Sequence, residues 1–176
     1  MGMSFGDYVK KGWEVIQLKG EAIDLLAQDE DAMGPALGIL AIGGVAAAIG
    51  ALSLPGIILM PILRLIGAFI FVGIMHFCAT TFFGGTGGFK GVFIPLCCAT
   101  LISWIGIIPI IGPVLAMLAG IWLLVVSVVI VERVHAMDRG KAIVVVAIPL
   151  LIGIVIAAIF AVIVGMSTLM LMGATS

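Results

Sequence analysis

Five long apolar stretches, separated by short polar, glycine-rich or proline-rich breaks, dominate this chain. They cover about residues 33–54, 57–83, 91–108, 114–131 and 142–172. A helix needs about 20 apolar residues to cross the hydrocarbon of a bilayer. Inside lipid, a segment must satisfy its backbone polar groups within itself, which favours helices. The pattern therefore predicts an all-α membrane protein with five transmembrane helices.

The first 31 residues follow a different pattern, in which apolar and polar positions are mixed at helical spacing. Ser4 and Asp7 have the spacing of a capping box, which predicts a helix start. Apolar residues then recur close to a seven-residue repeat, at Val9, Trp13, Ile16, Ile23 and Ala27. We expect one amphipathic helix, which either lies at the membrane interface or docks a soluble partner. The predicted division is a cytoplasmic helix with an acidic linker over 1–31 and a transmembrane domain over 32–176.

Two of the breaks contain residues that end helices. They are Gly84, Gly85, Gly87 and Gly88 in the first break, and Pro109, Gly112 and Pro113 in the second. The glycine-rich break lacks the lysine and hydroxyl of a phosphate-binding loop, so we expect a turn that ends a helix with glycine in left-handed geometry. The proline-rich break leaves room only for a very tight connection. The helices on either side of it should form a close hairpin.

Composition and charge narrow the class further. Apolar residues make up 64% of the chain and charged residues 10%, and the mean hydropathy is +1.43. These values lie outside the range of water-soluble domains. The net charge of −1 offers no basic surface for nucleic acid. Three cysteines inside apolar runs do not form a disulfide framework.

The positions of the basic residues predict the orientation of the five helices. With a cytoplasmic N-terminus, most of the basic residues face the cytoplasm: Lys10, Lys11, Lys19, Lys90, Arg133, Arg139 and Lys141. Only Arg64 then lies toward the opposite side. This bias follows the positive-inside rule, so we expect the N-terminus inside and the C-terminus outside.

Arg64 is the only charged residue between Asp31 and Lys90. An arginine near the middle of a bilayer costs about 2.5 to 3.5 kcal/mol on insertion scales, whereas one near a helix end can extend to the headgroups. Arg64 lies between these positions. Two interpretations remain open: a structural or snorkelling arginine, and an arginine that faces a polar cavity or pore.

A metal site is a weaker hypothesis. If the glycine-rich break folds the second and third helices into an antiparallel pair, His76 and Cys78 lie at the same depth as Cys97 and Cys98. One imidazole and three thiols suit Zn(II) or Cu(I). Adjacent cysteines on a helix point about 100° apart, however, and cysteines in membrane helices are usually packing residues. We therefore predict no metal and no other cofactor.

Catalysis is not indicated either, and we predict no catalytic residue. No acidic side chain lies between Asp31 and Glu132, so the paired carboxylates or metal triads of intramembrane enzymes are missing there. Glu132 and His135 are spaced to share one helix face, but a hydrated helix end is the favoured interpretation. Lys90, Arg133 and Arg139 are interpreted as charges that set the topology.

Several of these segments together resemble the Yip-domain membrane proteins, whose eukaryotic members bind Ypt/Rab GTPases. The resemblance lies in the order of the glycine-rich break with Phe82 and Phe83, the proline-rich hairpin, and the charged exit from Glu132 to Ala142. It covers about residues 30–165 and implies a five-helix membrane domain with a cytoplasmic N-terminus. The chain lacks the Asp-Leu-Tyr-Gly-Pro motif of the eukaryotic members and is more similar to compact prokaryotic members. The family supplies no catalytic or ligand residues to carry over.

The leading hypothesis is a non-enzymatic integral membrane protein that organises membrane or partner proteins. The N-terminal helix would bind a cytoplasmic protein, and small residues such as Gly34 and Gly38 would support a homo-oligomer in the bilayer. A prokaryotic plasma membrane is the expected location. The alternative is a channel or a transporter of small solutes or ions with a polar path near Arg64.

Overall fold

The computed structural model describes the backbone of residues 3–174 and the side chains of residues 3–166. The described backbone is helical, without strands. Its elements are α1 (Phe5–Ile16), α2 (Gly20–Gln28), the short 3₁₀ helix η1 (Glu30–Ala32), α3 (Met33–Gly50), α4 (Gly56–Phe83), α5 (Phe89–Ala99), the 3₁₀ helix η2 (Thr100–Ile107), α6 (Gly112–Val134) and α7 (Arg139–Ala174).

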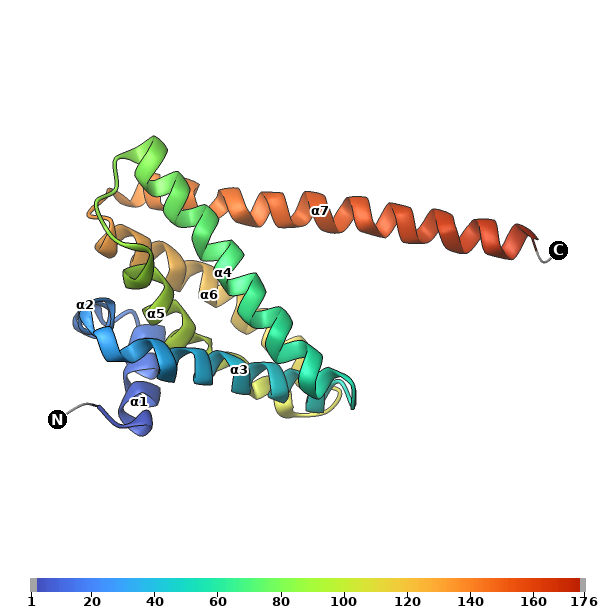
Figure 1. Cartoon of the computed structure of the whole chain (residues 1–176), viewed down its shortest axis with the longest axis horizontal. Coiled ribbons are helices and arrows are strands. Elements are labelled where there is room, and N and C mark those ends of the chain that lie inside the picture. Colours follow the sequence, from blue (N-terminus) through green and yellow to red (C-terminus); the bar gives the residue numbers. More distant parts are fainter. Residues whose placement is uncertain (1–2, 175–176) are drawn as a thin grey trace.

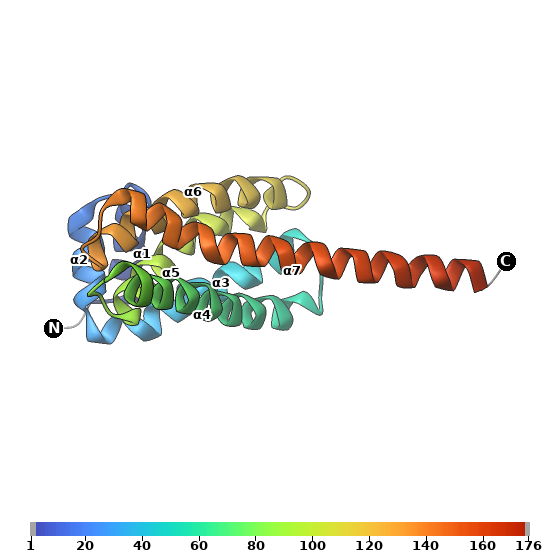
Figure 2. The ribbon, with the colours of Figure 1, turned by 90° about the horizontal axis from the view of Figure 1, so that it is seen from above.

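Five helical segments in the described part of the chain are long and apolar enough to cross a membrane. They are η1 with α3, then α4, then α5 with η2, then α6, and finally α7. This confirms the predicted number of crossings. Figure 1 shows α5 between α4 and α1, below the first and above the second, while α7 runs on past the rest of the bundle. The view from above in Figure 2 also shows α7 extending beyond the other helices.

The centre of the bundle is α5. Its residues from Gly91 to Ala99 are all buried, and it contacts α1, α2, α3, α4 and α6. Phe93 on α5 stacks on Phe69 of α4 and on Phe89, with ring centroids 4.5 Å and 5.3 Å away. Aromatic rings at such distances add to the dispersion contact that holds helices together in lipid.

Helix α3 packs closely against its neighbours at some of its small residues. A Cβ on Gly44 would lie 2.5 Å from the Cα of Pro61 in α4, and one on Gly50 would meet the carbonyl oxygen of Gly106 in η2. Small residues allow this close approach of backbones. The two glycines expected to mediate self-association behave differently. Among the described residues, none lies within 4 Å of a Cβ placed on Gly34, and only Phe5 of the same chain does so at Gly38.

The prediction of one continuous N-terminal helix is wrong. The chain breaks between α1 and α2, where Leu18 takes a left-handed backbone with φ of 62°. The Lys19 amide donates to the carbonyl of Glu14, and the Leu18 amide to that of Val15. These two bonds form a Schellman motif, which ends a helix and usually has glycine at its left-handed position. Because leucine occupies the left-handed position, the sequence does not reveal the break.

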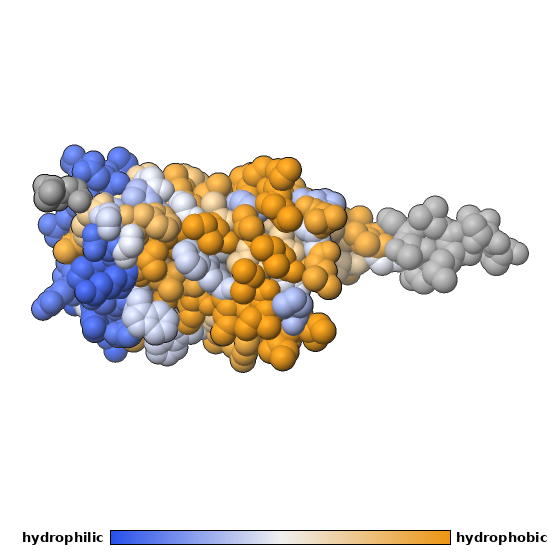
Figure 3. Space-filling view, turned by 90° about the horizontal axis from the view of Figure 1, so that it is seen from below, coloured by the Kyte–Doolittle hydropathy of each residue, from blue (hydrophilic) through white to orange (hydrophobic). Residues whose placement is uncertain are grey.

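Hydrophilic residues gather at one end of the bundle. This end, called the polar end below, carries residues 3–31, 84–90 and 132–141. On the face drawn in Figure 3, hydrophobic residues cover most of the rest of the described bundle. The capping box predicted at the start of α1 is present, because the Asp7 amide donates to Ser4 Oγ and the Ser4 amide donates to Asp7 Oδ2.

Candidate functional site at the polar end

Helices α1 and α2 are docked on the bundle through their apolar sides. Tyr8, Val15 and Ile16 of α1 and Ala22, Ile23 and Leu26 of α2 are buried. Gly12 makes the approach to α5 possible, because a Cβ there would lie only 2.4 Å from the carbonyl oxygen of Cys98. A glycine inside a helix costs about 1 kcal/mol relative to alanine, and here the close packing on α5 offsets this cost.

Polar contacts fasten α1 to the end of α2 and both helices to α6. The Tyr8 hydroxyl donates to Asp29 Oδ2 at 2.9 Å, and Trp122 of α6 donates from Nε1 to the carbonyl of Ile16 at 3.0 Å. Arg133 of α6 forms a two-pronged bond with Asp24 of α2, with Nε 3.1 Å from Oδ1. This hydrogen bond, together with the charge of Arg133, holds the pKa of Asp24 below its ordinary value despite partial burial.

The glycine-rich break forms a loop over residues 84–88, and the predicted turn is present. Gly84 ends α4 in left-handed geometry with φ of 69°, and the Gly85 amide donates to the Ala79 carbonyl at 2.8 Å. The loop then lies against the end of α6. A Cβ on Gly85 would come within 2.8 Å of His135 Nδ1, and one on Gly87 would lie 2.2 Å from the carbonyl oxygen of Val134. Glycine is required here because no side chain fits.

His135 joins this loop to α6. Its Nδ1 accepts a hydrogen bond from the Gly87 amide at 3.1 Å, and its carbonyl accepts one from the Thr86 amide at 3.4 Å. The residue is only 1% exposed, so the interpretation of this position as a hydrated helix end is wrong. Glu132 does not pair with it, because the carboxylate accepts from Arg139 Nε at 3.0 Å.

The second histidine of the chain lies beside the first. The ring centroids of His76 on α4 and His135 are 5.4 Å apart, and Phe89 contacts the His76 ring edge to face at 6.2 Å. Two ring nitrogens, His76 Nδ1 and His135 Nε2, are buried without a hydrogen-bond partner among the described residues. Each such group costs about 1–3 kcal/mol. This histidine pair was not predicted, although the chain has only two histidines.

The proposed common depth of His76 with Cys97 and Cys98 is wrong. His76 lies level with Phe89, and Phe69 lies level with Phe93, so α5 begins well below the end of α4. The loop runs back along the bundle rather than reversing at the membrane surface, as Figure 1 shows. The three cysteines are buried free thiols, and no group of three histidine, cysteine or acidic residues able to hold a metal is found among the described residues.

A polar hollow of about 380 Å³ adjoins the loop. It lies between α2, the loop, the start of α5 and the end of α6, and its polar side chains include Lys90, Arg133 and Asp24. Because Arg133 is already paired with Asp24, Lys90 is the basic residue of the hollow without an ion-pair partner among the described residues. The structure thus brings Lys90, Arg133 and His135 to the same end of the bundle, with Glu132 and Arg139 nearby.

Arg64 lies apart from this site. Its guanidinium donates to Ser103 Oγ of η2 at 2.6 Å and lies against Gly43, where a Cβ would be 2.8 Å from a guanidinium nitrogen. Trp104, one residue after Ser103, donates from its indole to the Ile39 carbonyl of α3 at 3.1 Å. These contacts tie α3, α4 and η2 together, in agreement with the structural interpretation of Arg64.

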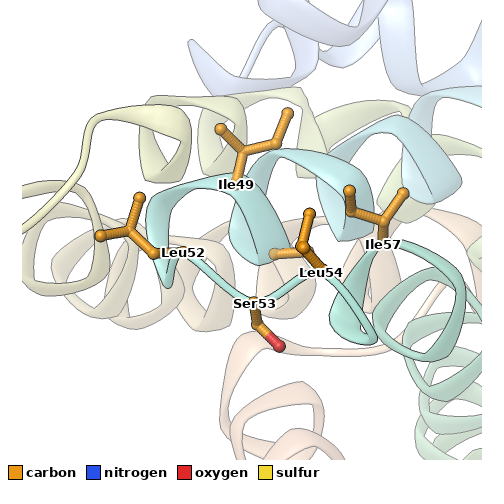
Figure 4. Close-up of a pocket in the computed structure, with 6 residues that line it drawn as sticks. Ile49, Leu52, Ser53, Leu54 and Ile57 are labelled. Atoms are coloured by element: carbon orange, nitrogen blue, oxygen red, sulfur yellow. The ribbon is translucent and has the colours of Figure 1, made fainter.

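A hollow of about 240 Å³ lies at the opposite end of the bundle, at the turn between α3 and α4. Ile49, Leu52, Leu54 and Ile57 surround it, and Ser53 is its polar residue (Figure 4). The Ser53 hydroxyl accepts from the Gly56 amide at 3.2 Å, so it serves to begin α4. This hollow has no charged lining residue and offers no chemistry to compare with the polar end.

Comparison with known protein families found a match over most of the chain. The Yip1 domain model matches residues 13–161. The chain belongs to the Yip1 domain family. The match covers the end of α1 from Trp13 onward, all of α2 to α6 and much of α7, so it includes most of the polar end. Searches of curated proteins and of solved structures found no match. Membership in the Yip1 family, with five spans, makes this a multi-pass integral membrane protein.

Proposed function

We propose that this Yip1-family protein organises partner proteins at the cytoplasmic face of a membrane without catalysing a reaction. The observation that carries the proposal is the two-sided character of α1 and α2. One side of each helix is buried on α5, and the other side is exposed at the polar end. The exposed positions include Lys10 and Trp13 on α1, Gln17 just after it, and Glu21, Leu25 and Gln28 on α2.

Two exposed apolar residues distinguish this face from an ordinary hydrated helix surface. Trp13 is 51% exposed and Leu25 is 42% exposed, and charged residues flank both. Exposed aromatic and aliphatic side chains within a polar surround are typical of protein contacts. Trp13 would also suit headgroup depth, so lipid contact is the competing use of this face.

The interior of the bundle supports an organising role over transport. The core around α5 is filled by apolar side chains, among them Phe93, Ile94, Val72 and Met75. Arg64, the residue on which a polar path would depend, is bonded to Ser103 and packed against α3. We therefore place transport second. The orientation with the polar end in the cytoplasm rests on the basic residues gathered there.

The proposal is tested by site-specific photocrosslinking in the native membrane. A photoreactive residue at Gln17 should crosslink to protein, and the double variant Trp13→Ser with Leu25→Ser should lose these crosslinks. The matched control is Phe82→Ser, which removes an aromatic residue from the end of α4 that is 67% exposed, somewhat more than Trp13. Crosslinks to lipid alone, or equal loss of protein crosslinks in the control, would overturn the proposal. Deleting α1 is unsuitable because it would uncover α5.

A further inference from the structure

The strongest unexplained feature is the contact between His135 and the glycine loop. The ring is enclosed: Gly85 has no room for a side chain beside it, and the Gly87 amide donates to Nδ1. A nitrogen that accepts a hydrogen bond carries no proton. The neutral ring therefore holds its proton on Nε2, where no partner is found among the described residues.

Protonation changes this contact from attraction to repulsion. A protonated imidazole carries a proton on both nitrogens and can only donate. Its Nδ1–H would then face the Gly87 amide N–H, and the bond at 3.1 Å could not persist. The loop would have to move away, because the close fit at Gly85 leaves the ring little freedom to turn.

We propose that His135 is a proton-sensitive latch that holds the loop of residues 84–88 against α6 when neutral and releases it when protonated. Release would alter the wall of the polar hollow, which Gly87 and Gly88 of the loop form together with Val134. The latch depends on hydrogen-bond chemistry alone, so it stands independently of the proposed function.

His76 is the titratable group that contacts His135. The other charged groups on the surrounding elements contact partners other than His135 or line the hollow. On α6, Arg133 is bonded to Asp24 of α2 and Glu132 to Arg139 of α7. Asp138 accepts from the Lys141 amide at the start of α7, and Lys90 of α5 lines the hollow.

The direction of the pH effect follows from the surroundings of the ring. Burial first, and the neighbouring His76 second, hold the pKa of His135 below its ordinary value of 6.5. The released form, with an ordinary pKa, takes up a proton more readily than the latched form. The latch is therefore fully stable above pH 6.5 and is weakened as the pH falls below that value toward the lower pKa of the latched state.

The same geometry argues against a metal ion bound between the two histidines. A metal on His135 Nε2 would displace the proton to Nδ1, because a neutral ring keeps one N–H. That proton would face the Gly87 amide and break the same bond. The latched ring is thus a poor metal ligand, and the proton is the ligand that the site distinguishes.

Amide hydrogen exchange of the full-length protein in detergent micelles tests the latch. At pH 7.5 the amides of Thr86 and Gly87 should exchange slowly relative to their intrinsic rates. At pH 5.0 their protection should fall, by no more than about 30-fold, which is the ratio of protonated to neutral released form 1.5 pH units below the ordinary pKa of 6.5. Peptides from the middle of α5 should keep their protection, which shows that the bundle stays folded. Equal loop protection at both pH values would overturn the proposal.

Two variants separate the latch from a general effect of acid. His135→Asn keeps an acceptor oxygen close to the position of Nδ1 but cannot titrate, so its loop should stay protected at pH 5.0 as at 7.5. His76→Asn removes the neighbouring imidazole, whose electrostatic effect lowers the pKa of His135, so the midpoint for loss of protection should move upward. An unchanged midpoint in His76→Asn, or the wild-type pH profile in His135→Asn, would contradict the latch. If His135→Asn does not fold, the pH dependence of loop protection in the wild type and in His76→Asn still tests the latch.

Discussion

Helices α5 and α7 differ in opposite ways in hydrophobicity and in burial. Of the spans in the described chain, α5 with η2 is the least hydrophobic and α7 the most hydrophobic. Yet every residue from Gly91 to Ala99 of α5 is buried in protein, whereas every described side chain of α7 from Leu150 to Met166 is exposed. In a water-soluble fold the more hydrophobic helix would be the buried one.

The difference follows from the solvent. Lipid tails are as apolar as leucine, so hydrophobicity does not draw a helix into the centre of a membrane bundle. Close packing does. Helix α5 lies opposite Gly12 of α1 and stacks Phe93 on Phe69, whereas the exposed part of α7 presents branched side chains and Phe160 to its surroundings.

The same truncation in both helices gives the largest expected difference. Phe93→Ala leaves a cavity in the aromatic cluster and should lower the free energy of unfolding by about 2 to 4 kcal/mol. In lipid most of this loss comes from the cavity rather than from the transfer of the side chain out of water. Phe160→Ala, at a side chain 67% exposed, should change it by less than about 0.5 kcal/mol. Unfolding by SDS in mixed micelles measures both. Equal losses would contradict the contrast between the helices.

Adding a methyl group tests whether α1 packs closely on α5 while α7 has free space around it. Gly12→Ala forces α1 away from the Cys98 carbonyl and should destabilise the fold by about 1 to 3 kcal/mol. Its control is Gly153→Ala in α7, where no atom lies within 4 Å, and the better helix propensity of alanine should leave stability unchanged or raise it by up to about 1 kcal/mol. Wild-type stability of Gly12→Ala would show that α1 is not held as described.

The smallest effect is expected at the ion pair that joins α2 to α6. Asp24→Asn should cost about 0.2 to 1 kcal/mol, because both side chains are more than 40% exposed. Since the pKa of Asp24 is lowered in the folded state, the contribution is present above its ordinary value of 3.8 and is lost as the pH falls below it. Thermal melts at pH 6 and pH 3, with and without 0.5 M salt, measure it. A salt-independent difference at both pH values would contradict the ion-pair assignment.

The sequence predicts the spans well because each one depends on composition over a long window. The glycine turn at Gly84 and the hairpin before Pro113 follow from the backbone preferences of single residues. The break at Leu18 was missed because a leucine holds a left-handed position that normally signals itself through glycine. The change to a 3₁₀ helix after Ala99 was missed as well, since the predicted span of 91–108 shows no interruption in its hydrophobic pattern.

The candidate site was harder to predict because it depends on which residues of different helices lie at the same depth in the bundle. Equal spacing on both sides of Thr86 suggested that His76 lies beside the cysteines. The loop instead folds back along the bundle and places His76 beside His135, 59 positions further along the chain. Only tertiary packing decides such a pairing. The rarity of histidine in this chain was the one signal that could have directed attention to it.

The unequal lengths of the helices have a consequence for the surrounding bilayer. Helix α3 has 18 residues and α7 has 36, so at 1.5 Å per residue they are about 27 Å and 54 Å long. The membrane span that contains α3 has 21 residues, whereas the described part of the span formed by α7 has 28. Each must be matched by thinning, thickening or tilt. We expect a protein with such unequal sides to impose a gradient of membrane thickness across its own width.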